Sequence, residues 1–401
     1  MSGGKKRILI SMHYLEIGGA EMALTGLLNA IDYSKCDVDL FLHSHRGEMM
    51  AFVPDEVNLL PEIPAYAQIE RPILGVLRDG YFKMAAARCK AKFQTWRYLR
   101  RKGVKDSVAG LQFTAAAIIK LLPAINPDVE YDLAISFLQP HNIVRDKVRA
   151  KKKACWIHTD YSGVDVNADQ EMPVWSAFDY IVSISDDVTR TFLRAFPTLS
   201  DKIIQIENIL SPAFVRKRAE EFRAELPSGQ NGVTLLSIGR FSNAKNYDNV
   251  PDICRRIVDA GIPDIKWFII GYGPDERLIR DRIAAVGMEE RVILLGKMIN
   301  PYPYIKACDI YVQPSRYEGK SVTVREAQIL CKPVAVTDYN TSSSQIKDGI
   351  DGVIVPMDNQ GCAEGIVRLI NDKAKQESLV QYLQTHDYGY ESEIDKLYGL
   401  I

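Results

Sequence analysis

Two glutamates flank a short β-branched run in the segment YEGKSVTVREA, residues 317–327. Glu318 precedes a glycine and is expected in a loop, whereas Glu326 is expected in a helix that ends before a proline. In this arrangement the helix N-terminus faces a phosphate group, and the two carboxylates accept hydrogen bonds from sugar or ribose hydroxyls on either side. The alternative is structural, because Thr323 and Glu326 have the spacing of a capping box.

Two cations stand close together in SIGRFSNAKNYDNV, residues 237–250, where a predicted strand ends at Gly239. A guanidinium at Arg240 and an ammonium at Lys245 can clamp the two phosphates of a nucleotide diphosphate. A departing diphosphate needs its developing charge neutralised, and cations together with helix dipoles can do this. The alternative is a pair of solvated surface cations, which is the commoner position of Arg and Lys.

A pair of glycines, Gly18 and Gly19, follows the first predicted strand and opens an amphipathic helix within residues 17–31. Backbone N–H groups at a helix N-terminus, unobstructed by Cβ atoms, can bind an anion. The full G-x-G-x-x-G pattern is absent, so a dinucleotide site is not indicated. The alternative is a tight strand-to-helix turn in which Glu21 stabilises the first helical turn by its charge.

These candidate sites follow apolar runs rich in Ile, Val and Leu, which alternate with helical patterns and predict parallel α/β sheets. The predicted strands lie at 8–12, 38–42, 133–137, 154–158, 180–185, 233–239, 265–271, 292–296, 310–314 and 333–337. A polar, charged stretch after the apolar run 203–208 separates two such series, as at a domain boundary.

We therefore expect three parts: an N-terminal Rossmann-like domain at 1–208, a C-terminal Rossmann-like domain at 209–375, and closing helices at 376–401. Open α/β sheets hold ligands at the carboxyl ends of their strands, so a cleft between the two sets of strand ends is expected to be the site.

The totals exclude several classes of protein. The 401-residue chain has 50 Lys and Arg against 51 Asp and Glu, which gives no reason to expect a nucleic-acid partner. Its seven cysteines form no C-x-x-C pair, which argues against a zinc site and favours a reducing cytoplasm. The N-terminus lacks a signal-peptide pattern, and no apolar run approaches the length of a membrane span. We expect a cytoplasmic protein.

In combination, these features resemble the retaining glycosyltransferases of family four, of the type that builds bacterial capsular polysaccharide, exopolysaccharide or lipopolysaccharide. The resemblance lies in Glu318 and Glu326, in the run 18–21, in Gly239-Arg240 with Lys245-Asn246, and in VAVTDYNTSSSQIKDGIDGVIV at 334–355. It covers most of the chain in the right order. It implies the α/β fold called GT-B, in which two Rossmann-like, doubly wound domains face a central cleft.

The resemblance also assigns roles in binding the nucleotide. It implies that Arg240 and Lys245 bind the donor diphosphate, that the Gly18-Gly19 loop closes on it, and that Glu326 holds the ribose hydroxyls. The backbone near Lys297 and Met298 is implied to read the nucleotide base. Further donor-binding residues implied in this way are Gly239, Gly319, Lys320, Ser321 and Val322.

The sugar end of the site shows departures from the family pattern. Glu318 is implied to lie near the transferred sugar, and His158 beside it, although a histidine that ends an apolar strand is often structural. Relatives commonly carry an aromatic residue and a glycine where this chain has Lys320 and Ser321, and many carry a glutamate where it has Gln345. The sugar pocket is therefore expected to be unusual.

The implied activity is metal-independent transfer, with retention, of a hexose or N-acetylhexosamine from a nucleotide diphosphate, with UDP expected, to a saccharide or lipid-linked saccharide acceptor. The nucleotide sugar is a co-substrate and no cofactor is expected. A D-x-D pair, Asp37 and Asp39, is typical of metal-dependent sugar transferases, but it begins a strand and is read as an accident. The alternatives are a nucleotide-sugar epimerase or hydrolase on the same fold, or an inactive nucleotide-binding relative.

One segment concerns the acceptor. Residues 81–105 hold nine Lys and Arg with no acidic residue, interleaved with aromatic side chains. Such a helix can lie on an anionic membrane surface, here the inner face of the cytoplasmic membrane, which suits a lipid-linked acceptor. The alternative is a solvated helix whose apolar side is covered by residues 111–122.

Overall fold

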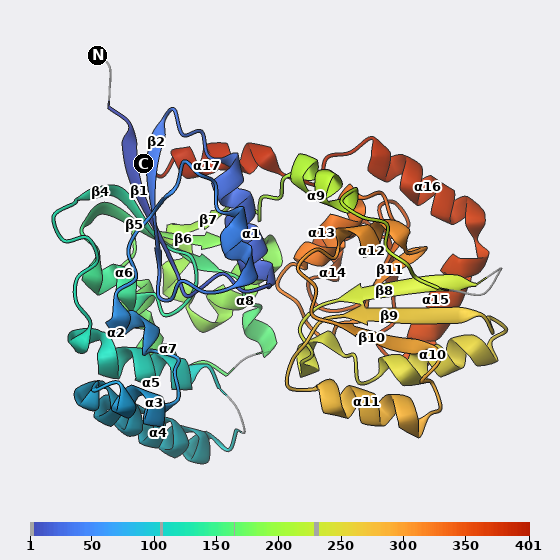
Figure 1. Cartoon of the computed structure of the whole chain (residues 1–401), viewed down its shortest axis with the longest axis horizontal. Coiled ribbons are helices and arrows are strands. Elements are labelled where there is room, and N and C mark those ends of the chain that lie inside the picture. The colour runs from blue at the N-terminus through green and yellow to red at the C-terminus, as the bar shows by residue number, and fades with distance from the viewer. Residues whose placement is uncertain (1–3, 105–106, 164, 228–231) are drawn as a thin grey trace. The chain divides into compact units, whose positions relative to one another are not determined.

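The computed structural model describes residues 4–104, 107–163, 165–227 and 232–401 (Figure 1). The chain divides into two compact units, residues 1–207 with 392–401 and residues 208–391. It therefore passes from one unit to the other twice, and the predicted closing segment 376–401 is shared between them. In the first unit the Tyr398 hydroxyl accepts a hydrogen bond from the Asp32 backbone N–H at 2.7 Å, which ties the C-terminal helix to the end of the first one.

The first unit is built on a seven-stranded parallel sheet in the order β3-β2-β1-β4-β5-β6-β7. Its strands are β1 (Lys6–Met12), β2 (Cys36–Leu42), β3 (Asn58–Leu59), β4 (Tyr131–Ser136), β5 (Ala150–Ile157), β6 (Tyr180–Ser183) and β7 (Ile203–Gln205). Its helices are α1 (Gly19–Ala30), α2 (Pro64–Ala67), α3 (Ile73–Arg78), α4 (Phe82–Lys102), α5 (Ala109–Ile118), α6 (Asn142–Lys147), α7 (Ala168–Trp175), α8 (Asp186–Ala195) and α17 (Ile394–Tyr398).

The second unit is built on a six-stranded parallel sheet in the order β10-β9-β8-β11-β12-β13. Its strands are β8 (Val233–Ile238), β9 (Ile265–Ile270), β10 (Val292–Gly296), β11 (Ile310–Gln313), β12 (Val334–Thr337) and β13 (Val353–Val355). Its helices are α9 (Pro212–Ala219), α10 (Val250–Asp259), α11 (Glu276–Ala285), α12 (Tyr302–Ala307), α13 (Val322–Ile329), α14 (Ser342–Gln345), α15 (Asn359–Asn371) and α16 (Lys373–Gln384).

The strand order reverses once in each sheet, between β1 and β4 in the first unit and between β8 and β11 in the second. At such a reversal the connections leave toward opposite faces of the sheet, so the loops at the strand ends part and leave a crevice for a ligand. Most predicted site residues of the second unit follow β8 and β11, the two strands at its reversal point, whereas Lys297 and Met298 follow the edge strand β10.

A buried polar relay joins the central strands of the second sheet. The Trp267 indole donates to the Ser237 hydroxyl at 2.9 Å, and that hydroxyl donates to the Val312 carbonyl at 2.6 Å. All three residues are buried, so every donor in the relay needs a protein partner and has one. The relay links β8, β9 and β11 and holds fixed the strand ends from which the candidate site extends.

The predicted α/β architecture with two parallel sheets is confirmed. Each predicted strand is present. The strands absent from the predicted list, β3, β7 and β13, are edge strands of two or three residues, and β7 lies within the apolar run 203–208. Strands β3 and β13 are too short to show a hydrophobic pattern of their own.

Candidate active site

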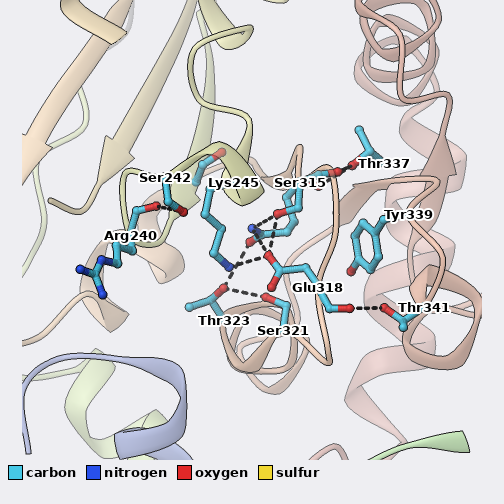
Figure 2. Close-up of polar contacts among 12 residues, drawn as sticks. Arg240, Ser242, Lys245, Ser315, Glu318, Ser321, Thr323, Thr337, Tyr339 and Thr341 are labelled. Atoms are coloured by element: carbon cyan, nitrogen blue, oxygen red, sulfur yellow. Dashed lines mark hydrogen bonds and ion pairs between the residues drawn. The ribbon is translucent and has the colours of Figure 1, made fainter. Parts of the chain in front are cut away.

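An ion pair joins the loops that follow β8 and β11. Lys245 Nζ lies 2.5 Å from Glu318 Oε1, and the two side chains are 18% and 12% exposed. The same carboxylate oxygen accepts hydrogen bonds from the Ser315 hydroxyl at 2.6 Å (Figure 2) and from Gln313 Nε2 at 3.2 Å. One cation and two neutral donors therefore fix the Glu318 carboxylate at the strand-order reversal.

A second ion pair holds the same two loops together. The Arg316 guanidinium donates to both carboxylate oxygens of Asp248, at 2.9 and 2.8 Å, and to the Asn243 carbonyl at 2.7 Å. Burial alone would raise the pKa of Asp248, but the hydrogen bonds from Arg316 hold it below its usual value. This bidentate bond sets the separation at which Lys245 meets Glu318. Sequence analysis missed both of its members, and their only signal is their position beside the predicted residues.

Arg240 does not join this cluster. Its side chain is exposed, and its guanidinium points away from the Lys245–Glu318 pair (Figure 2). Among the residues that the structure describes, the guanidinium has no hydrogen-bond or ion-pair partner. The structure therefore brings together Lys245 and Glu318 of the predicted catalytic set, and leaves Arg240 in solvent.

Close backbone contacts fix the loop after β8. The Phe241 N–H donates to the Tyr272 carbonyl at 2.8 Å. A Cβ atom on Gly273 would lie 2.3 Å from the Phe241 carbonyl oxygen, and one on Gly271 would lie 1.9 Å from that of Gly239. Only glycine permits these approaches, so the G-x-G after β9 holds the loop that carries Arg240. Sequence analysis did not assign a role to these glycines.

The capping-box alternative for Glu326 is wrong. Helix α13 begins at Val322, with Ser321 at its N-cap and no side-chain cap, so Thr323 lies inside the helix. Glu326 is 2% exposed, and its Oε1 accepts a hydrogen bond from the Tyr302 hydroxyl at 2.8 Å. Burial raises the pKa of Glu326 to about 7, against a smaller opposing effect of that hydrogen bond. Its binding of ribose hydroxyls stays a prediction.

The remaining donor-side residues differ in exposure. Ser321 and Val322 are buried, so side-chain contact with a ligand is restricted there. The Lys320 ammonium lies 5.6 Å from the centre of the Tyr390 ring. Near the predicted base-reading segment, the exposed Lys297 places its ammonium 4.7 Å from the centre of the Tyr272 ring, and Met298 is partly exposed.

In the first unit, Gly18 is the N-cap of α1, in extended conformation. A Cβ atom at this position would lie 2.3 Å from Glu21 Oε2, so the Glu21 carboxylate packs directly against the glycine. This contact matches the structural alternative, in which Glu21 stabilises the first turn. An anion that approaches the helix N-terminus would meet this carboxylate as well as Gly19.

His158 lines a cavity of about 230 Å³ in the first unit, together with His13, Gln139, Trp156, Tyr161 and several apolar residues. Its Nε2 atom is buried and has no hydrogen-bond partner among the described residues. Burial lowers the pKa of His158 to about 4, so the ring is neutral near pH 7. An unpartnered imidazole nitrogen that lines a cavity favours the ligand-binding interpretation over the structural one.

Sequence analysis missed His13, which stands in the same cavity. Its Nδ1 lies 2.7 Å from Glu70 Oε1, and its Nε2 contacts the Gln139 carbonyl oxygen. Both ring nitrogens therefore face acceptors. Glu70 lies 57 positions away in the sequence, so no local pattern could have shown this pair.

The carboxylates of the D-x-D pair have protein partners. Asp39 accepts hydrogen bonds from the Tyr131 hydroxyl at 2.5 Å and from Asn58 at 2.7 Å, and Asp37 lies 3.4 Å from the Lys5 ammonium. Within the described ranges, no group of three or more His, Cys, Asp or Glu side chains is arranged to hold a metal ion.

The basic segment forms one helix, α4, and Lys105 at its end lies outside the described residues. Helices α3 and α5 pack against α4, which buries Met84, Ala85 and Ala91. Three aromatic side chains stay exposed, at 68%, 60% and 53% for Phe82, Phe93 and Trp96. Neighbouring helices thus cover one apolar side of α4, as the solvated-helix alternative predicts. The exposed aromatic side chains form a second apolar face that these helices do not cover. Among the described helices, none has the length and apolar character that crossing a bilayer requires.

Comparison with known proteins identifies relatives of both sequence and fold. The family model for "Glycosyl transferases group 1" matches residues 218–386. The chain is similar to the alpha-D-kanosaminyltransferase of Streptomyces kanamyceticus, with 23% identity over 55% of this chain and 59% of that protein. It is also similar to the UDP-Gal:alpha-D-GlcNAc-diphosphoundecaprenol alpha-1,3-galactosyltransferase of Escherichia coli, with 26% identity over 36% of this chain and 38% of that protein. The similarity thus spans less than two thirds of each of these relatives.

Solved structures match the whole fold. The structure of Anabaena HepE in complex with UDP and glucose superposes with a TM-score of 0.66 at 16% identity, and covers 98% of this chain and 99% of that one. At this identity the likeness establishes the fold alone. The predicted GT-B fold is therefore confirmed.

The glycine contacts lead to a stability prediction. We expect Gly273→Ala to destabilise the second unit by about 1–3 kcal/mol beyond the cost of its positive φ, because the new methyl overlaps the Phe241 carbonyl. The matched control is Gly261→Ala, where φ is +97° and a Cβ meets nothing within 4 Å. Urea unfolding of both variants measures the difference, and equal destabilisation would contradict the packing argument.

Burial of Glu326 leads to a pH prediction. A carboxyl whose folded pKa is raised from 4.5 to about 7 favours folding most below pH 4.5, and that advantage is lost as pH rises through about 7. Glu326→Gln removes this dependence and keeps an acceptor for Tyr302. From pH 4.5 to pH 8, the stability of the variant relative to wild type should rise by up to about 3 kcal/mol. Urea unfolding at both pH values tests this, and a constant difference would show that Glu326 is not perturbed.

Proposed function

We propose that this chain is a group 1 glycosyltransferase, as the match of residues 218–386 to that family model supports. It transfers a sugar from UDP to a saccharide acceptor, without a metal ion and with retention of anomeric configuration. The observation that carries the proposal is the Lys245–Glu318 pair at the strand-order reversal of the matched segment. The pair places the Lys245 ammonium, which can bind a diphosphate, next to the Glu318 carboxylate, which can accept hydrogen bonds from sugar hydroxyls. The similar Escherichia coli enzyme has UDP-Gal in its name, and the similar Anabaena HepE structure is a complex with UDP and glucose. Both support UDP as the nucleotide.

In the proposed reaction, the bond between the sugar C1 and the diphosphate oxygen breaks, and a bond from C1 to the acceptor oxygen forms on the same face. The proton of the acceptor hydroxyl passes to the departing diphosphate oxygen. Lys245, Arg240 after rotation of its exposed side chain, and the N-terminus of α13 stabilise the negative charge that develops on the diphosphate. Glu318 orients the sugar and Glu326 the ribose, each as a hydrogen-bond acceptor.

The two cations should matter far more for transfer than for folding. We expect Arg240→Ala and Lys245→Ala each to lower kcat/KM by about 100-fold or more, because a cation that stabilises the leaving group acts mainly in the transition state. Arg277→Ala, at an exposed position on α11, is the matched control and should have no effect. Release of UDP from a panel of UDP-sugars measures turnover, and circular dichroism checks the fold. Turnover near wild type in the double variant would rule out the assignment.

The same assay, run without an acceptor, distinguishes a transferase from a nucleotide-sugar epimerase. A UDP-sugar that returns with its sugar altered but still joined to UDP would indicate an epimerase. A donor that persists until a saccharide acceptor is added is the result expected of a transferase.

For the acceptor, we propose a lipid-linked saccharide that the protein reaches at the inner face of the cytoplasmic membrane, in the synthesis of a surface polysaccharide. Helix α4 carries eight of the nine basic residues and no acidic one, and its exposed Phe93 and Trp96 stack with ring centres 5.7 Å apart. Cations flanking exposed aromatic side chains fit an anionic bilayer surface, where the rings enter the interface and the cations meet phosphates. The similar Escherichia coli enzyme has a diphosphoundecaprenol-linked acceptor in its name, which agrees with this choice.

A native thiol makes the membrane proposal testable. Cys89 is exposed on α4, four positions before Phe93 and seven before Trp96, so it lies on the same helix face; the other cysteines are buried except the partly buried Cys331. An environment-sensitive fluorophore on Cys89 should shift to the blue on vesicles of equal phosphatidylglycerol and phosphatidylcholine. It should shift little on phosphatidylcholine alone or at high salt.

The double variant Phe93→Ser, Trp96→Ser should bind the anionic vesicles about tenfold or more weakly. It lacks the two apolar side chains that move from water into the bilayer interface on binding. Leu278→Ser is the matched control, an exposed apolar residue on α11 of the other unit. Vesicle sedimentation of unlabelled protein measures affinity. Equal binding to neutral and anionic vesicles, or wild-type binding by the double variant, would contradict the proposal.

A further inference from the structure

Ser321 and Gln345, 24 positions apart in sequence, contact each other in the second unit. The Ser321 backbone N–H donates to Gln345 Oε1 at 2.9 Å, and Gln345 Nε2 donates to the Ser321 carbonyl at 2.5 Å. Both residues are buried. The side-chain amide thus bonds both polar groups of one residue's backbone, as a neighbouring strand would.

An amide completes this pair at any pH, whereas an ionised carboxylate does not. Its oxygen accepts and its nitrogen donates, so it matches a backbone N–H and C=O at the same time. An ionised carboxylate has two acceptors, one of which would face the Ser321 carbonyl oxygen at hydrogen-bond distance, in a buried place where that repulsion is strong. The Tyr339 hydroxyl, 3.3 Å from Gln345 Oε1, donates to the same oxygen and so fixes the orientation of the amide.

The contact bears on the candidate site because Ser321 is the N-cap of α13 and lies three residues after Glu318. The other end of this short loop is held from the same segment, since the Thr341 hydroxyl donates to the Glu318 carbonyl at 2.9 Å (Figure 2). Residues 341–345 therefore hydrogen-bond to both ends of the loop, at Glu318 and at Ser321. Glu318 is held at its side chain by Lys245 and at its backbone by Thr341.

We propose that Gln345 is a positioning residue for donor use: its amide fixes the Ser321 backbone, and with it the start of α13 and the place of Glu318. The inference rests on the proposed transferase function and extends it.

The test compares Gln345→Glu with Gln345→Met across pH 5.5 to 8.5, with kcat and donor KM measured for a UDP-sugar that the wild type uses. Methionine has similar length and makes neither hydrogen bond, so its kcat/KM should fall by about tenfold or more at every pH. Protonated glutamate can donate to the Ser321 carbonyl, and burial beside that oxygen favours the protonated form. The ratio of Gln345→Glu to wild type should therefore approach one at pH 5.5 and fall about tenfold or more by pH 8.5. Gln381→Glu, at an exposed position on α16, controls for the added charge.

A ratio for Gln345→Glu that does not change with pH, or Gln345→Met turnover equal to wild type, would overturn the inference. Amide hydrogen exchange of Ser321 gives a readout that needs no turnover: its protection should be lost in Gln345→Met, and unchanged protection would also overturn the inference. Absence of transfer by the wild type from every UDP-sugar would instead refute the proposed function, and the exchange result would still decide whether Gln345 fixes Ser321.

Discussion

The bidentate bond between Arg316 and Asp248 sets the distance between two loops, and the candidate chemistry of the second unit depends on that distance. A strand-order reversal parts the loops after β8 and β11, because their helices leave on opposite faces of the sheet. Parted loops need something to hold them in register. The planar guanidinium of Arg316 does so with fixed geometry. The Lys245–Glu318 ion pair therefore does not have to hold the two loops together by itself.

The two cations of the candidate site in the second unit differ in whether they have an ion-pair partner. Lys245 is paired with Glu318, whereas Arg240 has no partner among the described residues, so Arg240 is the cation whose charge is available to an incoming anion. Glu326 of the second unit is buried, and burial raises its pKa to about 7. In the first unit, burial likewise favours the neutral form of His158 and lowers its pKa to about 4. In the proposed function Glu326 binds hydroxyls by hydrogen bonding, which needs no full charge, and a partly protonated carboxyl would repel a nearby diphosphate less than an ionised one.

Hydrophobic periodicity was enough to predict the strands and their division into two series, because parallel strands buried on both faces form continuous apolar runs. It was enough to place Lys245 and Glu318 at strand ends. It could not show that they pair, since 73 positions separate them and no local pattern links them. The capping box failed for a related reason: Thr323 and Glu326 have the spacing, but Tyr302, from another helix, contacts the carboxylate instead. The Arg316–Asp248 and Ser321–Gln345 contacts are likewise tertiary, and side-chain geometry alone reveals them.

The return of the chain to its first unit limits how this protein can be recombined. Residues 392–401 belong with residues 1–207, and the Tyr398 hydroxyl closes on the backbone just after α1. An exchange of the second unit for that of a relative with another donor would therefore need two junctions, one near residue 208 and one near residue 391. A single crossover would supply a foreign C-terminal helix to the native first sheet. An exchange that keeps the first unit intact therefore replaces an internal segment between two junctions and does not join two halves.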